Sequence, residues 1–416
     1  MLTGVAGLVS FGGYVRTSGL DRELARTFDD MKPGRLVVYP MSAQIRLGLD
    51  SYVAGETRVF GIEALAADSV FVRLAGGVVP SLDTVYRDFE RFDADRCRKL
   101  EAIVARAGLA RVARLRVPMV HMDVDTSVTP VDGEHEGAVP GPNPRYRGRP
   151  GYHPIFARVA ESDTLVGATL RRGDTGLGED DADLIGQWVE RVRAVLGPKR
   201  EVCVRIDAGG DCAAILQAIH ARKGYFLVKA RLTQDLVSAL MAQTEWRTVE
   251  RDALGKPTRQ IAELPFQRSS WGKLEVRVIA SRTSDRESRQ LALWDGVDLD
   301  SVHVYLTNRP DDADDIAWDY DGRAGIEPLI AELKGALGLG HHSSWHFDAN
   351  HAAMLVKMLA HNLVLSWVDA EHPPLRKWRL PWLRRALIRV PGRMTRSGRQ
   401  RSIHVPPASA LARQLN

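Results

Sequence analysis

The chain has 416 residues, with 57 Lys and Arg against 52 Asp and Glu and a net charge of +5, and its pI is about 9.1. This length predicts two or three domains, and the mildly basic balance is compatible with a nucleic-acid partner. The three cysteines, Cys97, Cys203 and Cys212, form no Cys-x-x-Cys pair and no even set. This argues against a zinc ribbon or a disulfide scaffold and favours a reduced, cytosolic setting.

No segment has the features of a membrane anchor. The apolar opening, residues 1–15, lacks the basic flank and the cleavage site of a signal peptide. The best candidate for a membrane span, residues 352–367, is interrupted by Lys357 and His361. We therefore expect a cytoplasmic protein with no membrane partner.

Residues 1–112 predict a helical N-terminal domain. Its expected helices, separated by turns that contain glycine or proline, are residues 20–28, 41–53, 62–67 and 82–92. In the last of these, Ser81 is placed to cap the N-terminus, and Val85 and Phe89 lie on one apolar side. This helix could dock in a DNA groove. Because Arg87 and Arg91 are its only cations, a helical bundle without groove contact is an equal alternative.

The hydrophobic pattern changes to a period of two at Val117. Strands are expected at residues 117–125, 153–160, 164–170, 201–207 and 225–231, and helices at 180–196 and 211–222. Three strands followed by helix, strand, helix and strand is an α/β order. The next segment, residues 232–301, contains further strand-like runs and predicts a mostly β insertion, after which residues 302–306 return to the main sheet.

The last part of the chain begins with a long apolar helix, expected at residues 350–368 and ended by Pro373 and Pro374. From Arg376 to Arg401 there are ten Lys and Arg residues and no acid. This basic region could contact DNA or a partner subunit. A solvated, disordered extension is the alternative, although its tryptophans and aliphatic residues favour folding against another surface.

One stretch, residues 318–339, carries the strongest chemical pattern. Tyr320, Arg323, Glu327 and Lys334 are spaced by three, four and seven residues, which places them on one face of a helix. Apolar residues at helical spacing form a second stripe, made of Ile326, Leu329, Ile330, Leu333 and Leu337. Pro328 lacks the N–H that a helix interior needs, so either the main helix begins near Glu327 or it kinks there.

The polar stripe has two interpretations. Charges at this spacing usually form a solvated face of an ordinary amphipathic helix. A carboxylate flanked by two cations and a phenol can instead serve an anionic substrate if a divalent metal offsets the repulsion of the carboxylate. That substrate would be a phosphate.

The pattern Tyr320-x2-Arg323-x3-Glu327-x6-Lys334 resembles the Tyr-Arg-Glu-Lys signature of bacterial insertion-sequence DDE transposases of the cut-and-paste type. The resemblance extends over residues 117–370. It implies an α/β, ribonuclease-H-like catalytic core, formed by residues 113–231 and 302–372 and interrupted by a β-rich insertion domain at 232–301. It also implies a DNA-binding role for the helical domain at 1–112, followed at the other end by the basic C-terminal region at 373–416.

The resemblance assigns three catalytic, metal-binding acids to Asp125, Asp207 and Glu327. Asp123 would face the same side of the strand as Asp125, and the pattern alone does not choose between them, but the family places a hydroxyl residue after the first acid, as Thr126 follows Asp125. A turn cap is the alternative role for Asp207. Three clustered carboxylates repel one another unless cations bind them, and oxygen ligands favour two Mg²⁺ or Mn²⁺ ions.

DNA-binding residues follow from the same resemblance. Tyr320, Arg323 and Lys334 are expected to hold phosphates of the transposon end. Trp271 and Trp294 in the insertion are candidates for stacking on a flipped base, with core packing as the alternative for each.

A zinc cluster is a further alternative for the segment GEHEGA, in which Glu134, His135 and Glu136 could join His121 and His153. No His-Glu-x-x-His or paired Cys/His spacing supports it, so a supporting role near the first acid is preferred.

The function implied is a DNA transposase. It would bind the inverted-repeat ends of its element, cut them by Mg²⁺-assisted hydrolysis and join the 3′-hydroxyl ends to target DNA, as a homodimer associated with the bacterial nucleoid. A nuclease of the same fold that does not join strands, and an inactive DNA-binding relative, are the alternatives.

Overall fold

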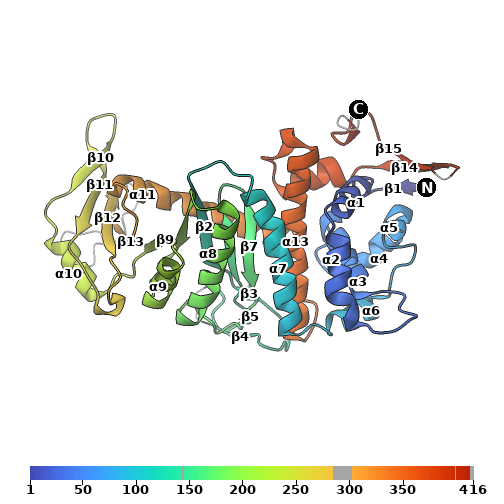
Figure 1. Ribbon diagram of the computed structural model, residues 1–416, viewed down its shortest axis with the longest axis horizontal. Coiled ribbons are helices and arrows are strands. Elements are labelled where there is room, and N and C mark those ends of the chain that lie inside the picture. Colours follow the sequence, from blue (N-terminus) through green and yellow to red (C-terminus); the bar gives the residue numbers. More distant parts are fainter. Residues whose placement is uncertain (142–144, 284–301, 399, 413–416) are drawn as a thin grey trace.

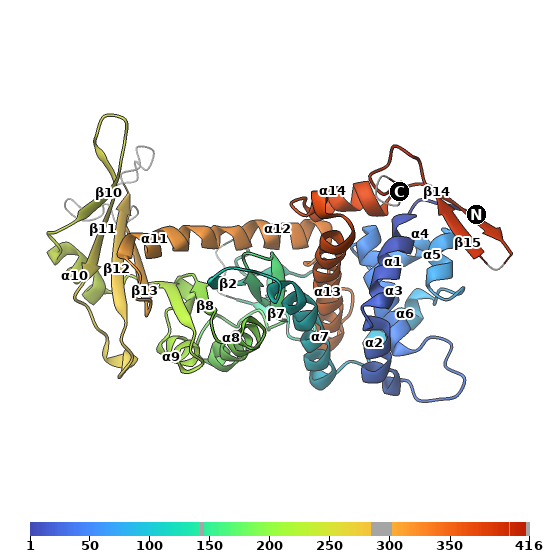
Figure 2. The same cartoon turned by 45° about the horizontal axis from the view of Figure 1, so that its top comes forward.

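The computed structural model describes residues 1–141, 145–283, 302–398 and 400–412. A mixed β-sheet lies at one end of the molecule and a helical region at the other, with the long helix α13 (Phe347–Glu371) between them (Figure 1, Figure 2). The N-terminus and the C-terminal strands β14 (Gly392–Ser397) and β15 (Gln400–His404) both lie on the helical side (Figure 1). The expected mixed α/β class is confirmed.

The N-terminal region is helical, as expected. Its helices are α1 (Gly7–Thr17), α2 (Leu20–Phe28), α3 (Met41–Ala54), α4 (Gly61–Ala66), α5 (Ser69–Leu74), α6 (Leu82–Phe89) and α7 (Ala94–Val112), and a 3₁₀ turn, η1 (Asp29–Met31), follows α2. Ser81 caps α6 as predicted, because its side chain accepts a hydrogen bond of 3.4 Å from the N–H three residues later. Asp93 caps α7 in the same way at 2.7 Å. Val85 and Phe89 of α6 are buried in the helical core.

The central sheet has nine strands in the order β10-β11-β12-β13-β9-β8-β2-β6-β7. They are β2 (Met119–Thr126), β6 (Ile155–Val159), β7 (Thr164–Thr169), β8 (Glu201–Ile206), β9 (Tyr225–Lys229), β10 (Arg247–Arg251), β11 (Pro257–Leu264), β12 (Arg277–Thr283) and β13 (Val302–Thr307). Strands β2, β8 and β9 are parallel, and the other neighbouring pairs are antiparallel. Because Val124 pairs with Ile206, the acids that follow them lie at the same edge of the sheet.

Strands of the inserted segment extend the central sheet. The segment is rich in strands, as expected, and begins with helix α10 (Gln234–Ala242). β12 pairs with β13, and β13 pairs with β9, so the predicted return to the main sheet at residues 302–306 is confirmed. However, β10, β11 and β12 continue that same sheet beyond β13, instead of forming a sheet of their own, because each strand pairs antiparallel with the next.

Each face of the sheet packs against helices. On one face, Val202 and Val204 of β8 share a core with α8 (Ala182–Leu196) and α9 (Ala213–Ala221). On the other face, Cys203 of the same strand packs with Ile316 of α11 (Ala313–Asp321). Figure 2 shows α11 and α12 (Ile326–Ala336) crossing one face, with α8 and α9 on the opposite side. Burial on both faces explains why β8 reads as a nearly continuous apolar run.

Short elements shape the loops around the main strands. They are a small sheet of β3 (Thr129–Pro130), β5 (Pro150–Tyr152) and β4 (Val139–Pro140), and the 3₁₀ turns η2 (Glu179–Asp181), η3 (Ala208–Gly210) and η4 (Ser269–Trp271). The small sheet follows β2 directly, so it lies in the connection that leaves the candidate first acid.

Helix α13 joins the sheet to the helical region. It is apolar and buried over most of its length, as expected for residues 350–368. The Asn362 side chain accepts a hydrogen bond of 3.0 Å from the Leu165 N–H and donates one of 2.9 Å to the Val104 carbonyl. One hydrophobic core therefore runs from the N-terminal helices through α13 to β7 and α12. In the part of the chain that the structure describes, no helix is long and apolar enough to cross a membrane.

The described part of the basic C-terminal region is folded. It contains η7 (Pro373–Leu375), α14 (Leu380–Leu383), a π-helical turn η8 (Arg384–Ile388), β14 (Gly392–Ser397) and β15 (Gln400–His404). β14 pairs with β1 (Leu2–Thr3) and with β15. Arg384 donates hydrogen bonds to the carbonyls of Tyr52, at 3.0 Å, and Ala336, at 2.9 Å. This arginine therefore ties the ends of α3 and α12 together.

Candidate active site

The signature segment consists of two helices joined by a 3₁₀ turn. Helix α11 carries Tyr320, the turn η6 (Gly322–Gly325) carries Arg323, and α12 begins at Ile326. Figure 2 shows α11 and α12 nearly in line. Of the two arrangements considered for Pro328, the structure has the one in which the main helix begins near Glu327. Pro328 is the third residue of α12, where its missing N–H breaks no intrahelical hydrogen bond.

The two stripes of α12 separate as predicted. Ile326, Leu329 and Leu333 are almost completely buried, and so is Leu337 after the helix end. The Glu327 side chain is 68% exposed. The apolar stripe therefore anchors α12 on the core and turns the carboxylate of Glu327 outwards.

Three acidic side chains from separate elements surround the guanidinium of Arg323. Its Nη2 atom lies 3.1 Å from Oδ1 of Asp125 and 3.9 Å from Oδ2 of Asp207, and its Nη1 atom lies 3.7 Å from Oε1 of Glu327. The structure thus brings the three predicted acids and the predicted arginine into one cluster. Exposure of the acidic side chains rises from 14% for Asp125 to 47% for Asp207, so the cluster is open on one side.

Asp123 belongs to a different set of contacts. It is fully buried, and its carboxylate accepts hydrogen bonds from Arg205 Nε at 2.6 Å and from Arg158 Nη1 at 3.1 Å. These contacts occupy Asp123 as a structural counter-ion. Of the two aspartates between which the sequence pattern does not choose, Asp125 is the one that lies beside Arg323.

The two carboxylate oxygens of Asp207 have different contacts. Oδ1 accepts a 2.9 Å hydrogen bond from the Gly209 N–H and so caps the short turn η3. Oδ2 points towards Arg323. Asp207 therefore does cap a turn, which was the alternative role, and its second carboxylate oxygen remains free to take part in the cluster around Arg323.

Negative charge exceeds positive charge at this cluster. Burial raises the pKa of Asp125 to about 6; Arg323 opposes this rise, whereas the carboxylates of Asp207 and Glu327 add to it. For Arg323, burial acts to lower the pKa, but the surrounding acids, first Asp125, outweigh it and raise the pKa. Three carboxylates against one guanidinium leave an excess that a divalent cation can neutralise.

Tyr320 and Lys334 make backbone contacts on either side of the acids. The Tyr320 hydroxyl donates a 3.3 Å hydrogen bond to the carbonyl of Ile206, the residue before Asp207. Lys334 Nζ donates a 3.0 Å hydrogen bond to the Val128 carbonyl, just after β2. Burial, aided by the nearby charge of Arg145, lowers the pKa of Lys334. Both residues thus link the signature helices to the strand ends that carry the first two acids.

Of the two tryptophans proposed for base stacking, only Trp271 lies in the part of the chain that the structure describes. Trp271 is only 1% exposed, and its ring packs edge-on against Phe266, with Arg268 above it. This position contradicts a stacking role for Trp271 in the present conformation and fits the alternative of core packing, because no face of the ring is open to a base. Trp294 lies outside the described residues.

The residues of the alternative zinc cluster do not meet. His121 Nδ1 lies 2.7 Å from Glu161 Oε1, whereas His153 Nε2 lies 2.9 Å from the Thr126 hydroxyl. His135 Nδ1 lies 2.7 Å from the Ser344 carbonyl, and Glu136 accepts a 2.9 Å hydrogen bond from the Phe347 N–H. The segment GEHEGA therefore contacts the start of α13, whereas His121 and His153 have other partners.

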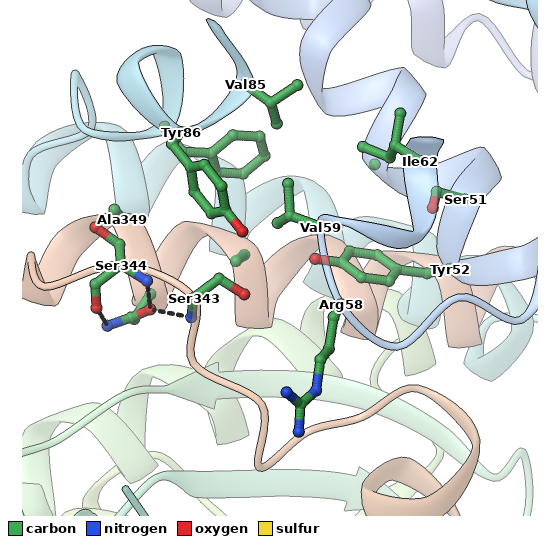
Figure 3. A pocket seen from close by; sticks show the side chains of 14 residues that line it. Ser51, Tyr52, Arg58, Val59, Ile62, Val85, Tyr86, Ser343, Ser344 and Ala349 are labelled. Atoms are coloured by element: carbon green, nitrogen blue, oxygen red, sulfur yellow. Dashed lines mark hydrogen bonds between the residues drawn. The ribbon is translucent and has the colours of Figure 1, made fainter. Parts of the chain in front are cut away.

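A separate apolar pocket lies between the N-terminal helices and α13. Figure 3 shows Tyr52, Val59 and Ile62 facing Val85 and Tyr86 across it. None of the predicted catalytic acids lines this pocket, and neither do those predicted DNA-binding residues that the structure describes.

An ion-pair network beside the acids was not predicted from the sequence. Besides Asp123 and its two arginines, it includes Asp319 of α11, which pairs with Arg309 and lies 3.4 Å from Nε2 of His121. Charged residues at alternate positions inside the buried strands, such as Arg205 in EVCVRI, were the available signal. The network fixes α11, and with it Tyr320, against β2 and β8.

A cluster of three acids and an arginine, open on one side and placed at the ends of two parallel strands, defines a site that can hold divalent cations beside a phosphate. Comparison with protein families gives a match over residues 1–416 to a family described as transposase DDE domain, group 1. The chain therefore belongs to this family of DDE transposases.

Among solved structures, the fold is similar to that of a piggyBac transposase in a synaptic complex with hairpin DNA. The TM-score is 0.51 at 10% sequence identity, and the match covers 91% of this chain and 78% of that chain. A search of curated protein sequences found no match.

Proposed function

We propose that this DDE transposase moves a bacterial insertion sequence by binding its terminal inverted repeats, cutting the ends and joining the 3′-hydroxyls to target DNA. The observation that carries the proposal is the convergence of Asp125, Asp207 and Glu327 on Arg323. The order β7-β6-β2-β8-β9, with the first acid on the central strand and the second after its parallel neighbour, supports the ribonuclease-H-like core.

The acids fit Mg²⁺ or Mn²⁺. All three offer carboxylate oxygens, which these hard cations prefer, and their charge exceeds that of Arg323. Two such ions, when bound, would activate a water or a 3′-hydroxyl and stabilise the leaving oxygen at a phosphodiester. The exposed carboxylates of Asp207 and Glu327 lie on the side from which a DNA backbone can approach.

Arg323, Lys334 and Tyr320 would position the scissile strand. In the structure, the guanidinium of Arg323 compensates the acids, and a bound metal would free part of its charge for a phosphate oxygen. Lys334 and Tyr320 donate to backbone carbonyls beside the acids, so small side-chain movements would bring both donors to phosphates.

Double-stranded DNA is the proposed partner, bound by a homodimer that holds both ends of the element. Cutting and joining two ends in one reaction requires that both be present together. The similar piggyBac structure is of a synaptic complex with hairpin DNA, and this supports the same kind of assembly here, at the bacterial nucleoid.

The experiment is an in vitro transposition assay with a plasmid that carries the terminal repeats of the element. The wild-type protein should release the element in Mg²⁺ and join it to a target plasmid, whereas EDTA or Glu327→Gln should abolish both steps. Release without joining would indicate the nuclease alternative. Specific binding without release, unchanged by Glu327→Gln, would contradict the catalytic assignment.

A further inference from the structure

Away from the acids around Arg323, three metal-ligating side chains meet where α7 packs on α13. The Sγ atom of Cys97, a ring nitrogen of His351 and a carboxylate oxygen of Asp348 all lie within 4.8 Å of one another. Within residues 1–141, 145–283, 302–398 and 400–412, no other group of three His, Cys, Asp or Glu side chains is as closely spaced. We propose that this cluster is a structural zinc site.

Burial of the cluster favours a bound ion. Cys97 is completely buried, and His351 is 9% exposed with no hydrogen-bond partner for its Nε2 atom. A buried ring nitrogen without a partner loses its hydration and gains nothing in return. Coordination at the imidazole would compensate this loss. Asp348 is half-buried, so a water molecule can reach the remaining coordination position.

The charges around the cluster also favour a bound cation. Two acidic side chains, Glu136 and Asp93, lie close enough to the Asp348 carboxyl to act on its charge. The Glu136 carboxylate also accepts the Phe347 N–H at the start of α13, and Asp93 caps the start of α7. The neighbouring charges that act on Asp348 are both negative, so a divalent cation would be attracted to this place.

The donor set identifies the metal class. One sulfur, one nitrogen and one oxygen donor suit Zn²⁺, whereas Mg²⁺ prefers oxygen alone. Asp348 and His351 are three residues apart and share one face of α13, and Cys97 lies in the first turns of α7. On binding, the Cys97 thiol would form a sulfur–zinc bond and release its proton to water.

The site would fasten the N-terminal helical region to the helix that supports the catalytic sheet. α7 follows the helical bundle and leads directly into β2, which carries Asp125. A metal between α7 and α13 would therefore stabilise the junction between the two parts of the molecule. Without a metal, Cys97 would remain a buried thiol whose S–H donates a 3.4 Å hydrogen bond to the Asp348 carbonyl.

The test uses the full chain carrying Asp207→Asn and Glu327→Gln, so that the proposed catalytic acids contribute no strong metal binding. The metal-stripped protein is titrated with Co²⁺, which gives a near-ultraviolet charge-transfer absorption only when a thiolate is a ligand. We expect one equivalent of Co²⁺ to produce this absorption and one equivalent of Zn²⁺ to abolish it. Elemental analysis after dialysis against Zn²⁺ should find one zinc per chain.

Variants locate the ligands. Cys97→Ser and His351→Gln should remove the absorption, and Asp348→Asn should weaken Zn²⁺ binding at least tenfold. Cys212→Ser, which changes a half-buried thiol elsewhere, is the matched control and should leave the absorption unchanged. Absence of a charge-transfer absorption in the folded parent protein, with circular dichroism confirming the fold, would overturn the proposal, as would an absorption that survives in Cys97→Ser. Either outcome leaves the catalytic proposal untouched.

Discussion

Arg323 Nη2 lies 3.1 Å from Asp125 Oδ1 at the centre of the three acids. This ion pair holds together carboxylates that would otherwise repel one another, in a position where their substrate and its metal ions are expected. The arginine is therefore a counter-ion within the site as well as a candidate phosphate ligand.

Arg323→Ala should increase the affinity for Mn²⁺ while reducing DNA cleavage. Removing a positive charge about 4 Å from the acids favours a cation by roughly 1–2 kcal/mol after allowance for solvent, or about tenfold in Kd. Cleavage should fall because the phosphate contact is lost. Titration calorimetry and a cleavage assay measure the two effects. Arg323→Lys, which retains the charge, is the control, and weaker Mn²⁺ binding by Arg323→Ala would contradict this account.

Asp123 and Asp125 should show opposite effects when mutated. Asp123→Asn leaves Arg158 and Arg205 without their buried counter-ion and should cost about 3–5 kcal/mol of stability. Asp125→Asn removes a carboxylate that burial and like charges already disfavour, so its stability should be unchanged or higher, with cleavage lost. Thermal unfolding and cleavage, measured on both variants, check the pair. Equal loss of stability in the two variants would argue against the assignment of Asp125 as the first catalytic acid.

His121 should make stability depend on pH. Burial acts to lower the pKa of His121, but the Asp319 and Glu161 carboxylates outweigh this effect and raise the pKa above its usual 6.5. Its stabilising contribution is fully present below the unfolded pKa and is lost as pH rises through the higher folded pKa. The Tm difference between wild type and His121→Gln should therefore shrink as pH rises above 6.5. A constant difference across this range would refute the link.

Pro328 should be replaceable without loss of function. As the third residue of α12 it needs no N–H partner, so Pro328→Ala should change stability by no more than about 1 kcal/mol and leave cleavage nearly unchanged. The exposed Ala331, one turn further on, provides the contrast, because Ala331→Pro should cost about 3 kcal/mol or more. Tm values for the two variants test the position of the helix start.

The sequence predicted those features that depend on local periodicity. The spacing of Ile326, Leu329 and Leu333 identified the buried side of α12. Alternation identified β2, and a short, nearly continuous apolar run identified β8. The membership of β10, β11 and β12 in the central sheet depends on pairing with β13, which is a long-range choice that local alternation does not encode.

The contacts of individual side chains were harder to predict from the sequence than the helices and strands. Asp123 and Asp125 are equivalent in strand periodicity. In the structure, Arg158 and Arg205 pair with Asp123, whereas Arg323 pairs with Asp125. Trp271 is an aromatic residue of the inserted segment, as expected of a stacking residue, but tertiary packing buries its side chain. Cys97 and Asp348 are 251 positions apart in sequence, so no local sequence motif predicts that they are in contact.

The most direct test of the catalytic site is the cleavage of a labelled duplex bearing a terminal repeat by Asp125→Asn, Asp207→Asn and Glu327→Gln, in Mg²⁺ and in Mn²⁺. The exposed Asp315 of α11 supplies the control, Asp315→Asn, which removes a nearby acid outside the cluster. Each of the three variants should lose at least about a hundredfold in rate while still binding the duplex, and Asp315→Asn should cut at the wild-type rate. Cleavage at the wild-type rate by any of these three variants would contradict the account.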